Sequence, residues 1–304
     1  MMDKQKPLIS YILITYNQEN FVRDALDGAF SQTYSPLEII IADDGSVDNT
    51  VKVITEIIAD YKGPHKITLL HSEKNVGIAQ NVNNAMSHAK GEYFIFAAGD
   101  DKSLPERAQR TYEVFSQYPD MTCINFASIR CDSNLKQIEM PATYEQNNLL
   151  SSINIYDYLE FSSFVLWSGD TRSIRRSLYD IFGPLTKGKD EDSSYFFRGL
   201  LMGCVGHSQE AFSLRRTHDL QVSNFRNIKK HISDDFLGQP MLDIHKALSK
   251  GIISQNIANR LLYKIKYGDR IIADQYYSAT SKLYNLIYKR PVDLLRRLKN
   301  KIFK

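Results

Sequence analysis

Two adjacent carboxylates, Asp100 and Asp101, follow an apolar run over residues 94–98 that is typical of a buried strand. Gly99 lies between this run and the carboxylates. Paired carboxylates at the carboxyl end of a strand can hold a hard divalent cation beside the phosphate groups of a substrate. The same pattern also occurs in turns and at helix starts, where Asp is favoured. The sharper hypothesis is a metal-assisted site for a phosphate leaving group.

Polar residues also follow earlier segments that are typical of strands. The segment over 8–15 leads into Tyr16, that over 38–42 leads into Asp43 and Asp44, and that over 67–70 is followed by Asn75-Val76-Gly77. Apolar residues at helical spacing lie between these segments, over 20–29, 51–58 and 79–86. This alternation predicts an α/β fold, in which a mostly parallel, twisted sheet carries helices on both faces and collects ligands at the carboxyl ends of its strands.

Three consecutive acids, Asp190, Glu191 and Asp192, precede a helix that we expect over 193–202. Acids at a helix start are stabilised by the helix dipole, so capping is one explanation. Capping alone does not require three acids, so a chemical role stays open. The other expected elements are a helix over 106–118, a strand over 121–129, a loop or hairpin over 133–148, a helix-like segment over 173–181, a strand from about 212, and mostly helix after 233.

The composition favours a globular protein with enough apolar residues for one large core or two ordinary ones. The 304 residues are 43% hydrophobic and 24% charged, with a net charge of +3. No apolar run reaches about 18 residues, so we expect a cytoplasmic protein without a membrane span. The three cysteines lack paired spacing and predict neither a disulfide framework nor a zinc site.

Positive charge is concentrated at the end of the chain. Residues 282–304 hold eight Lys or Arg and one acid, Asp293, so the rest of the chain is net negative and is not expected to bind nucleic acid. Leucines on one side of 291–304 predict a basic amphipathic helix. Such a helix can lie on the anionic inner face of the cell membrane, or it can pack on the body or on a second subunit of a homo-oligomer, and the sequence favours neither.

The order of the motifs resembles the inverting family 2 glycosyltransferases, which have the GT-A nucleotide-sugar-binding fold. The motifs are Ile-Thr-Tyr-Asn at 14–17, Asp-Asp-Gly-Ser at 43–46, Asn-Val-Gly at 75–77, Gly-Glu-Tyr at 91–93, Gly-Asp-Asp at 99–101, Glu-Asp at 191–192 and Arg-Thr-His at 216–218. The resemblance covers roughly residues 7–223, and bacterial enzymes that build O-antigen or capsular polysaccharide are the most similar. It implies a GT-A domain over 1–230 and a C-terminal helical region over 231–304.

The resemblance implies that Tyr16 stacks on the nucleobase of the donor and that Asp44 accepts a hydrogen bond from it. An aromatic face beside a carboxylate acceptor suits uracil and its N–H group. The other residues that the resemblance places in the donor site are Thr15, Asn17, Asp43, Asn75, Gly77 and Asp100.

The resemblance also implies a site for Mn²⁺ or Mg²⁺. Asp101 would bind the cation that bridges the diphosphate, Asp100 would hold either the ribose or the cation, and His218 would contact the cation or the diphosphate. Many relatives have a further Asp where this chain has Ala98, so the division of roles between Asp100 and Asp101 stays open.

Asp192 stands in the place of the family's catalytic base, with Glu191 as the alternative. A base there removes the proton of the acceptor hydroxyl during a single displacement with inversion. The implied activity is transfer of a hexosyl or N-acetylhexosaminyl group, from a UDP-sugar to a saccharide or lipid-linked acceptor. The alternatives are a non-catalytic sugar-nucleotide-binding or assembly protein and a nucleotidyltransferase, although residues 15–19 lack the glycine-rich phosphate loop of the latter.

Overall fold

The computed structural model describes residues 5–139, 150–161, 171–186, 191–218 and 238–267. The strands of these residues form one sheet of ten, with the main order β3-β2-β1-β4-β9-β6-β10-β5. The strands are β1 (Ile9–Thr15), β2 (Leu37–Asp43), β3 (Lys66–His71), β4 (Tyr93–Ala98), β5 (Lys102–Ser103), β6 (Met121–Cys131), β7 (Gln137–Glu139), β8 (Leu150–Asn154), β9 (Arg172–Arg175) and β10 (Cys204–Arg216). The helices are α1 (Val22–Phe30), α2 (Thr50–Asp60), α3 (Ile78–His88), α4 (Arg107–Gln117), α5 (Ile155–Phe161), α6 (Arg176–Phe182), α7 (Glu191–Met202), α9 (Gly238–Ser249) and α10 (Gln255–Tyr267).

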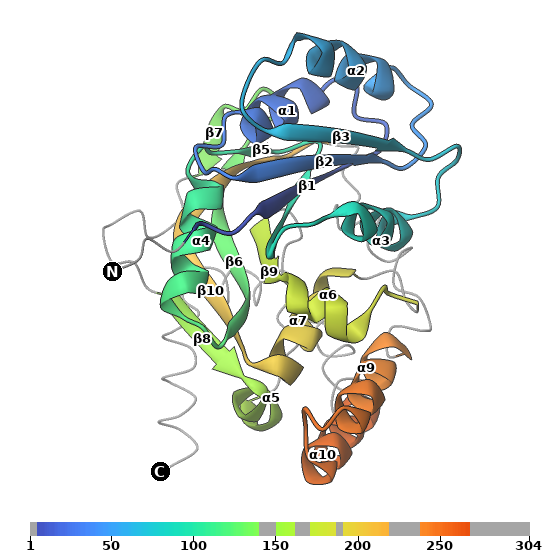
Figure 1. Cartoon of the computed structure of the whole chain (residues 1–304), viewed down its shortest axis with the longest axis vertical. Coiled ribbons are helices and arrows are strands. Elements are labelled where there is room, and N and C mark those ends of the chain that lie inside the picture. Colours follow the sequence, from blue (N-terminus) through green and yellow to red (C-terminus); the bar gives the residue numbers. More distant parts are fainter. Residues whose placement is uncertain (1–4, 140–149, 162–170, 187–190, 219–237, 268–304) are drawn as a thin grey trace.

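The first four long strands are parallel and carry helices on both faces, as the sequence predicts (Figure 1). β1 shows why: its side chains alternate between the two faces, as in any strand. Tyr11 and Leu13 join the apolar cluster under α1, α2 and α4, whereas Ile12 joins the cluster under α3 and α7. Both faces of this strand are therefore buried, which accounts for its nearly continuous apolar sequence.

The second half of the sheet is mixed, because β9 lies antiparallel between β4 and β6 while β6 and β10 are parallel. The expected helix over 173–181 is therefore wrong at its start, and α6 begins only at Arg176. Ile174 and Leu178 have helical spacing, but Ile174 is fully buried within β9, where pairing with two strands outweighs the local pattern. β10 also begins earlier than expected, at Cys204.

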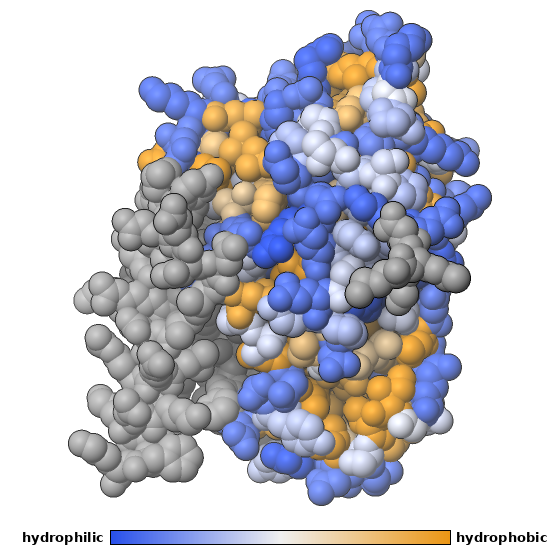
Figure 2. Space-filling view, turned by 60° about the vertical axis from the view of Figure 1, so that its left-hand side comes forward, coloured by the Kyte–Doolittle hydropathy of each residue, from blue (hydrophilic) through white to orange (hydrophobic). Residues whose placement is uncertain are grey.

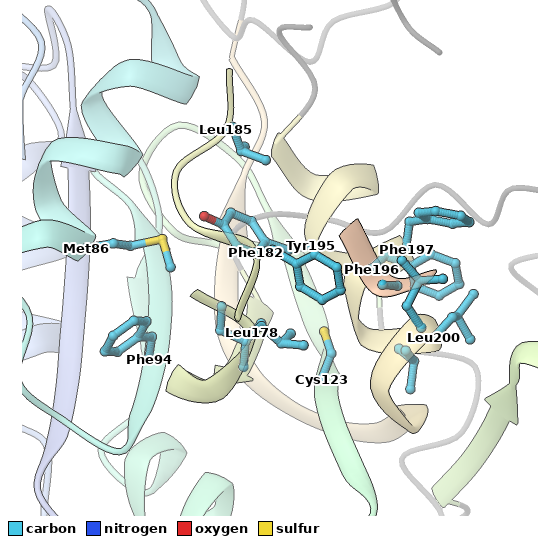
Figure 3. Packing of buried hydrophobic residues seen from close by; sticks show 14 of the residues in the cluster. Met86, Phe94, Cys123, Leu178, Phe182, Leu185, Tyr195, Phe196, Phe197 and Leu200 are labelled. Carbon is cyan, nitrogen blue, oxygen red and sulfur yellow. The ribbon is translucent and has the colours of Figure 1, made fainter. Parts of the chain in front are cut away.

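Helix α9 packs on α7, and α10 packs on α9 and α5, within the apolar cluster that lies under α3 and α7. Phe196 and Leu200 of α7 lie in this cluster (Figure 3), together with Ile244 of α9 and Leu261 of α10. Beside it, Arg198 of α7 donates to Asp243 of α9 at 2.8 Å. Because α7 carries Glu191 and Asp192, the C-terminal helices support the helix that bears the predicted base.

The helical prediction after 233 is confirmed over 238–267, except for the break around Gly251 that the sequence indicates. The basic tail over 291–304 lies outside the described residues, so its helix and its contacts stay predictions. A domain boundary near 230 stays a prediction for the same reason.

No helix of the described segments is long and apolar enough to cross a bilayer. On one face of the molecule a belt of polar side chains separates patches of apolar ones (Figure 2).

Candidate functional site

The polar residues that follow β1, β2 and β4 lie at one edge of the sheet, as predicted. Main-chain hydrogen bonds hold these loops together: the N–H of Asp44 donates to the carbonyl of Thr15 at 3.0 Å, and that of Gly99 donates to Ile14 at 2.9 Å. Main-chain hydrogen bonds alone therefore hold the loops after β2 and β4 beside the end of β1.

Asp43 is the buried hub of this edge. Its carboxylate, which has no exposed surface, accepts hydrogen bonds from Thr15 Oγ1 at 2.9 Å, Ser46 Oγ at 2.5 Å and His71 Nδ1 at 3.0 Å. Asp43 and Thr15 thus hold the loops together, and their place in the donor site stays a prediction. No sequence motif points to His71, although it ends β3 directly opposite Asp43 of β2.

Asn17 fixes the loop after β1 and leaves Tyr16 at the surface. Asn17 has φ of 51°, its N–H donates to Ser46 Oγ at 2.8 Å, and its Oδ1 accepts from the N–H of Val47 at 2.9 Å. The side chain of Tyr16 stays 41% exposed, so its ring is open to stacking.

Asp44 organises the start of α3. Its two oxygens accept the N–H groups of Val76 at 2.8 Å and Gly77 at 3.0 Å, and Asn75 Oδ1 also accepts from Gly77 at 3.1 Å. Gly77 has φ of 89°, a conformation that favours glycine. Burial raises the pKa of Asp44 above its ordinary value, against the two N–H groups, which favour the charged form. The structure thus brings Asp44, Asn75 and Gly77 together.

Gly99 lets the loop after β4 approach the loop after β1. A Cβ atom at this position would lie 2.2 Å from Gln18 Oε1 and 2.7 Å from Thr15 Cγ2. Gln18 can move its flexible end, but the buried Thr15 cannot, so the position of the loop that carries Asp100 depends on glycine at 99.

His218 and the paired acids come together although they are far apart in the sequence. His218 Nε2 lies 3.1 Å from Asp100 Oδ2, and the imidazole packs on Phe21 with 4.4 Å between ring centroids. His218 Nδ1 is buried and has no hydrogen-bond partner among the described residues. Asp101 is 7% exposed, and its Oδ1 accepts the N–H of Arg216 at 2.7 Å.

Arg216 is a supporting residue to which the sequence assigned no role. Its side chain is buried, Nε donates to the carbonyl of Asp100 at 2.7 Å, and Nη2 donates to Asp24 of α1 at 2.7 Å. The guanidinium carbon lies 4.8 Å from the centre of the Phe21 ring. Arg216 thus joins α1, the acidic loop and the end of β10. The motif at 216–218 includes this arginine, but its contacts with Asp24 and Asp100 are long-range and do not follow from the motif.

The donor atoms at this end suit a divalent cation. Carboxylate oxygens are the preferred ligands of Mg²⁺ and Mn²⁺, and imidazole is also accepted by Mn²⁺. The unpartnered Nδ1 of His218 leaves one buried polar atom for which the described chain gives no partner. Within the described segments, however, no group of three or more His, Cys, Asp or Glu side chains is arranged to hold a metal ion. Asp100 Oδ2 and His218 Nε2, two atoms that could bind such an ion, are hydrogen-bonded to each other in this structure.

The two candidate bases begin α7. Glu191 is 7% exposed and Asp192 26%, and Asp192 Oδ1 accepts a hydrogen bond from Arg172 Nη1. Asp190 lies outside the described residues, so the capping explanation stays untested. Asp192 is nevertheless connected to the end of β4, because the guanidinium carbon of Arg172 lies 4.5 Å from the centre of the Phe96 ring.

Curated relatives match parts of this chain. A glycosyltransferase of Rickettsia typhi, itself uncharacterized, is 28% identical over 224 residues, which are 72% of this chain and 66% of that protein. An uncharacterized protein of Mycobacterium bovis is 34% identical over 136 residues, which are 44% of this chain and 39% of that protein. The chain therefore spans less than half of the mycobacterial relative that it matches.

Solved structures of glycosyltransferases share the fold at low sequence identity. S. aureus TarS 1–349 in complex with UDP-GlcNAc matches with a TM-score of 0.63 and 16% identity, over 92% of this chain and 78% of that one. The mannosyltransferase PcManGT from Pyrobaculum calidifontis, in complex with GDP-Man and Mn²⁺, matches with a TM-score of 0.55 and 16% identity, over 94% and 84%.

The sequence pattern of glycosyl transferase family 2 matches residues 10–181, which are more than half of the chain and include the ends of β1, β2 and β4. The chain belongs to glycosyl transferase family 2 and has the GT-A fold.

Proposed function

We propose that this chain transfers a sugar from a nucleotide-diphosphate donor, a UDP-sugar, to a saccharide or lipid-linked saccharide, with inversion at the anomeric carbon. The observation that carries the proposal is the contact between Asp100 and His218 at the end of β4, on the sheet edge that also presents Tyr16 and Asp44. Tyr16 can stack on the base of a nucleotide, and Asp100 and His218 can bind a cation beside its leaving diphosphate.

The nucleobase end is formed by Tyr16 and Asp44. The exposed ring of Tyr16 offers a face for stacking, and Asp44 has oxygen lone pairs beyond the two that accept Val76 and Gly77. A carboxylate acceptor favours a base with an N–H group, such as uracil. The similar structures hold UDP-GlcNAc and GDP-Man, which supports a hexosyl or N-acetylhexosaminyl donor.

The diphosphate end is formed by Asp100, Asp101 and His218, which would hold Mn²⁺ or Mg²⁺ together with oxygens of the diphosphate, since a cation of this kind is often held by one or two carboxylates and substrate phosphates. When bound, the cation neutralises the charge that develops on the leaving diphosphate. Arg216 holds both acids in place, through the carbonyl of Asp100 and the carboxylate of Asp101.

Asp192 is the proposed base, with Glu191 as the alternative. The acceptor oxygen forms a bond to the anomeric carbon while the bond from that carbon to the diphosphate oxygen breaks, and Asp192 takes the hydroxyl proton. Asp192 suits this role better than Glu191, because it is more exposed. Oδ2 of Asp192 also has no hydrogen-bond partner among the described residues.

The pathway we propose is the synthesis of a cell-surface polysaccharide of the O-antigen or capsular type. We propose with it a peripheral position on the anionic inner face of the cell membrane, where lipid-linked acceptors lie and to which the basic tail over 291–304 would be attracted.

The test is a thermal-shift screen of UDP-, GDP- and dTDP-sugars with Mn²⁺, followed by product analysis by NMR. A donor that binds the folded chain raises its Tm. We expect a UDP-sugar to give the largest shift and the product to have the inverted anomeric configuration. Binding without turnover, across saccharide and lipid-linked acceptors, would instead support a non-catalytic sugar-nucleotide-binding protein.

A further inference from the structure

Arg172 is a fully buried arginine in the middle of the sheet. It begins β9, which lies between β4 and β6, and its side chain is 1% exposed. Its guanidinium carbon lies 4.5 Å from the ring centre of Phe96 on β4 and 5.4 Å from that of Tyr195 on α7. Two aromatic rings on different elements therefore contact the guanidinium and limit its movement.

The charge of Arg172 is directed at the start of α7. Nη1 donates to Oδ1 of Asp192, the main ion-pair contact of that carboxylate. Burial disfavours the charged guanidinium, but the carboxylates of Asp192 and Glu191 outweigh burial and raise the pKa of Arg172 above its ordinary value. Arginine is not deprotonated in proteins, so the ion pair with Asp192 is a contact between a full positive charge and a carboxylate.

The contact uses only one oxygen of Asp192. Oδ2 has no hydrogen-bond partner in the described part of the chain, and the side chain is 26% exposed. A carboxylate held at one oxygen has its other oxygen fixed in direction and available to accept a proton.

Arg172 also connects this carboxylate to the other half of the site. Phe96, against which it packs, lies four residues before Asp100 on the same strand and loop. The carbonyl of Phe96 accepts from Nη2 of the buried Arg107 at 2.6 Å, so this part of β4 is itself fixed. Arg172 thus bridges the end of β4 and the start of α7.

We propose that Arg172 is a positioning residue for the transfer reaction. Packed between Phe96 and Tyr195, it holds Oδ1 of Asp192, so that Oδ2 faces the acceptor hydroxyl while the donor is bound at the end of β4. The inference rests on the proposed function and adds to it a residue that acts through Asp192. A misplaced base lowers the rate of the chemical step without changing donor affinity, because a small displacement is enough to cost catalysis.

The test compares Arg172→Ala and Arg172→Lys with Arg198→Ala. Arg198 is the matched control, because it is also fully buried and its guanidinium carbon lies 5.2 Å from the same Tyr195 ring, but it pairs with Asp243. The reaction is nucleotide release with Mn²⁺ and with water as the acceptor. The donor is whichever of UDP-glucose, UDP-N-acetylglucosamine and GDP-mannose raises the Tm of the wild type most. Donor Kd, Tm and kcat are measured for each variant, with and without guanidinium chloride at concentrations far below those that denature.

We expect Arg172→Ala to lose about 10- to 100-fold in kcat with nearly unchanged donor Kd, and to recover part of kcat when free guanidinium occupies the vacated space. Arg172→Lys keeps the charge but not the planar group, so its kcat falls less. Arg198→Ala loses Tm but keeps the kcat of its folded fraction, with no recovery by guanidinium.

If Arg172→Ala does not fold, Arg172→Lys decides the question. A folded variant of Arg172 with wild-type kcat overturns the proposal, as does an equal loss of kcat in Arg198→Ala. If the wild type releases no nucleotide with water, the same comparison is made with saccharide and lipid-linked acceptors. A wild-type chain that releases no nucleotide with any of these acceptors overturns the proposed function, and this inference with it.

Discussion

His218 and Asp100 are 118 positions apart in the sequence, yet Nε2 of the imidazole lies 3.1 Å from Oδ2 of the carboxylate. The contact forms because β10 ends beside the loop that follows β4, where Arg216 binds the carbonyl of Asp100. The chain thereby joins an acid from its first half to a histidine from its second half at the proposed cation site.

Removal of divalent metal is expected to weaken donor binding. Calorimetry in EDTA should give a UDP-sugar Kd at least about tenfold above that in Mn²⁺, equal to about 1.4 kcal/mol of binding free energy. His218→Ala should lose most of this metal dependence, whereas His88→Ala, at an exposed histidine of α3, should keep it. Equal UDP-sugar affinity with and without metal would contradict the proposal that Asp100, Asp101 and His218 hold a cation.

Gly99→Ala is expected to displace the acidic loop, because the new Cβ would lie 2.7 Å from Cγ2 of Thr15. Thr15 is buried and bonded to Asp43, so it cannot move aside as the flexible end of Gln18 can. The predicted loss is about 1–3 kcal/mol of unfolding free energy, with a further loss of donor affinity. Gly206→Ala is the control, since the atoms nearest its new Cβ are at the flexible end of Met121. Unchanged donor affinity in a folded Gly99→Ala would show that the loop tolerates the shift.

The pH dependence of stability is expected to include His65. This histidine is 7% exposed, and burial lowers its pKa below the ordinary 6.5, against the hydrogen bond from Nε2 to the carbonyl of Gln32, which raises it. Below about pH 6.5 the unfolded chain takes up a proton that the native state does not, so the free energy of unfolding falls by at most about 1.4 kcal/mol per pH unit until the native pKa is passed.

Urea denaturation between about pH 7.5 and 5.5 measures this contribution. His65→Gln keeps an N–H donor for Gln32 and has no proton to gain, so its stability should fall less over the same range. Parallel curves for the two proteins would contradict the assignment.

Deletion of residues 291–304 is expected to reduce co-sedimentation with anionic liposomes and to leave donor Kd unchanged. Each basic residue near such a surface contributes about 1 kcal/mol. Neutral liposomes are the control. Equal co-sedimentation of the full and truncated chains would favour packing of the tail on the body or on a second subunit.

The sequence predicts the first half of the sheet and the location of its polar residues well, because buried parallel strands have continuous apolar sequences. Asp44, Asn75 and Gly77 meet as expected, and so do Asp100 and His218. These residues end or follow strands, and the carboxyl ends of parallel strands share one edge.

The supporting arginines could not be predicted in the same way. The apolar spacing at Ile174 and Leu178 indicates a helix, and only pairing with β4 and β6 makes 172–175 a strand and buries Arg172. Arg216 likewise depends on a long-range contact with Asp24. The spacing of residues along the sequence does not indicate such tertiary contacts.

The most direct test of the proposed reaction is kcat for Asp192→Asn, measured beside donor Kd and Tm. Asparagine keeps the shape of the side chain and an oxygen for Arg172, but it cannot take the acceptor proton. Loss of a general base costs about 10²–10⁴-fold in rate, whereas loss of a helix cap alone costs about 1 kcal/mol of stability and leaves the turnover of folded molecules intact. The account predicts a folded variant with wild-type donor affinity and a kcat lower by at least about 10²-fold. A folded, donor-binding Asp192→Asn with near wild-type kcat would contradict it and transfer the role to Glu191.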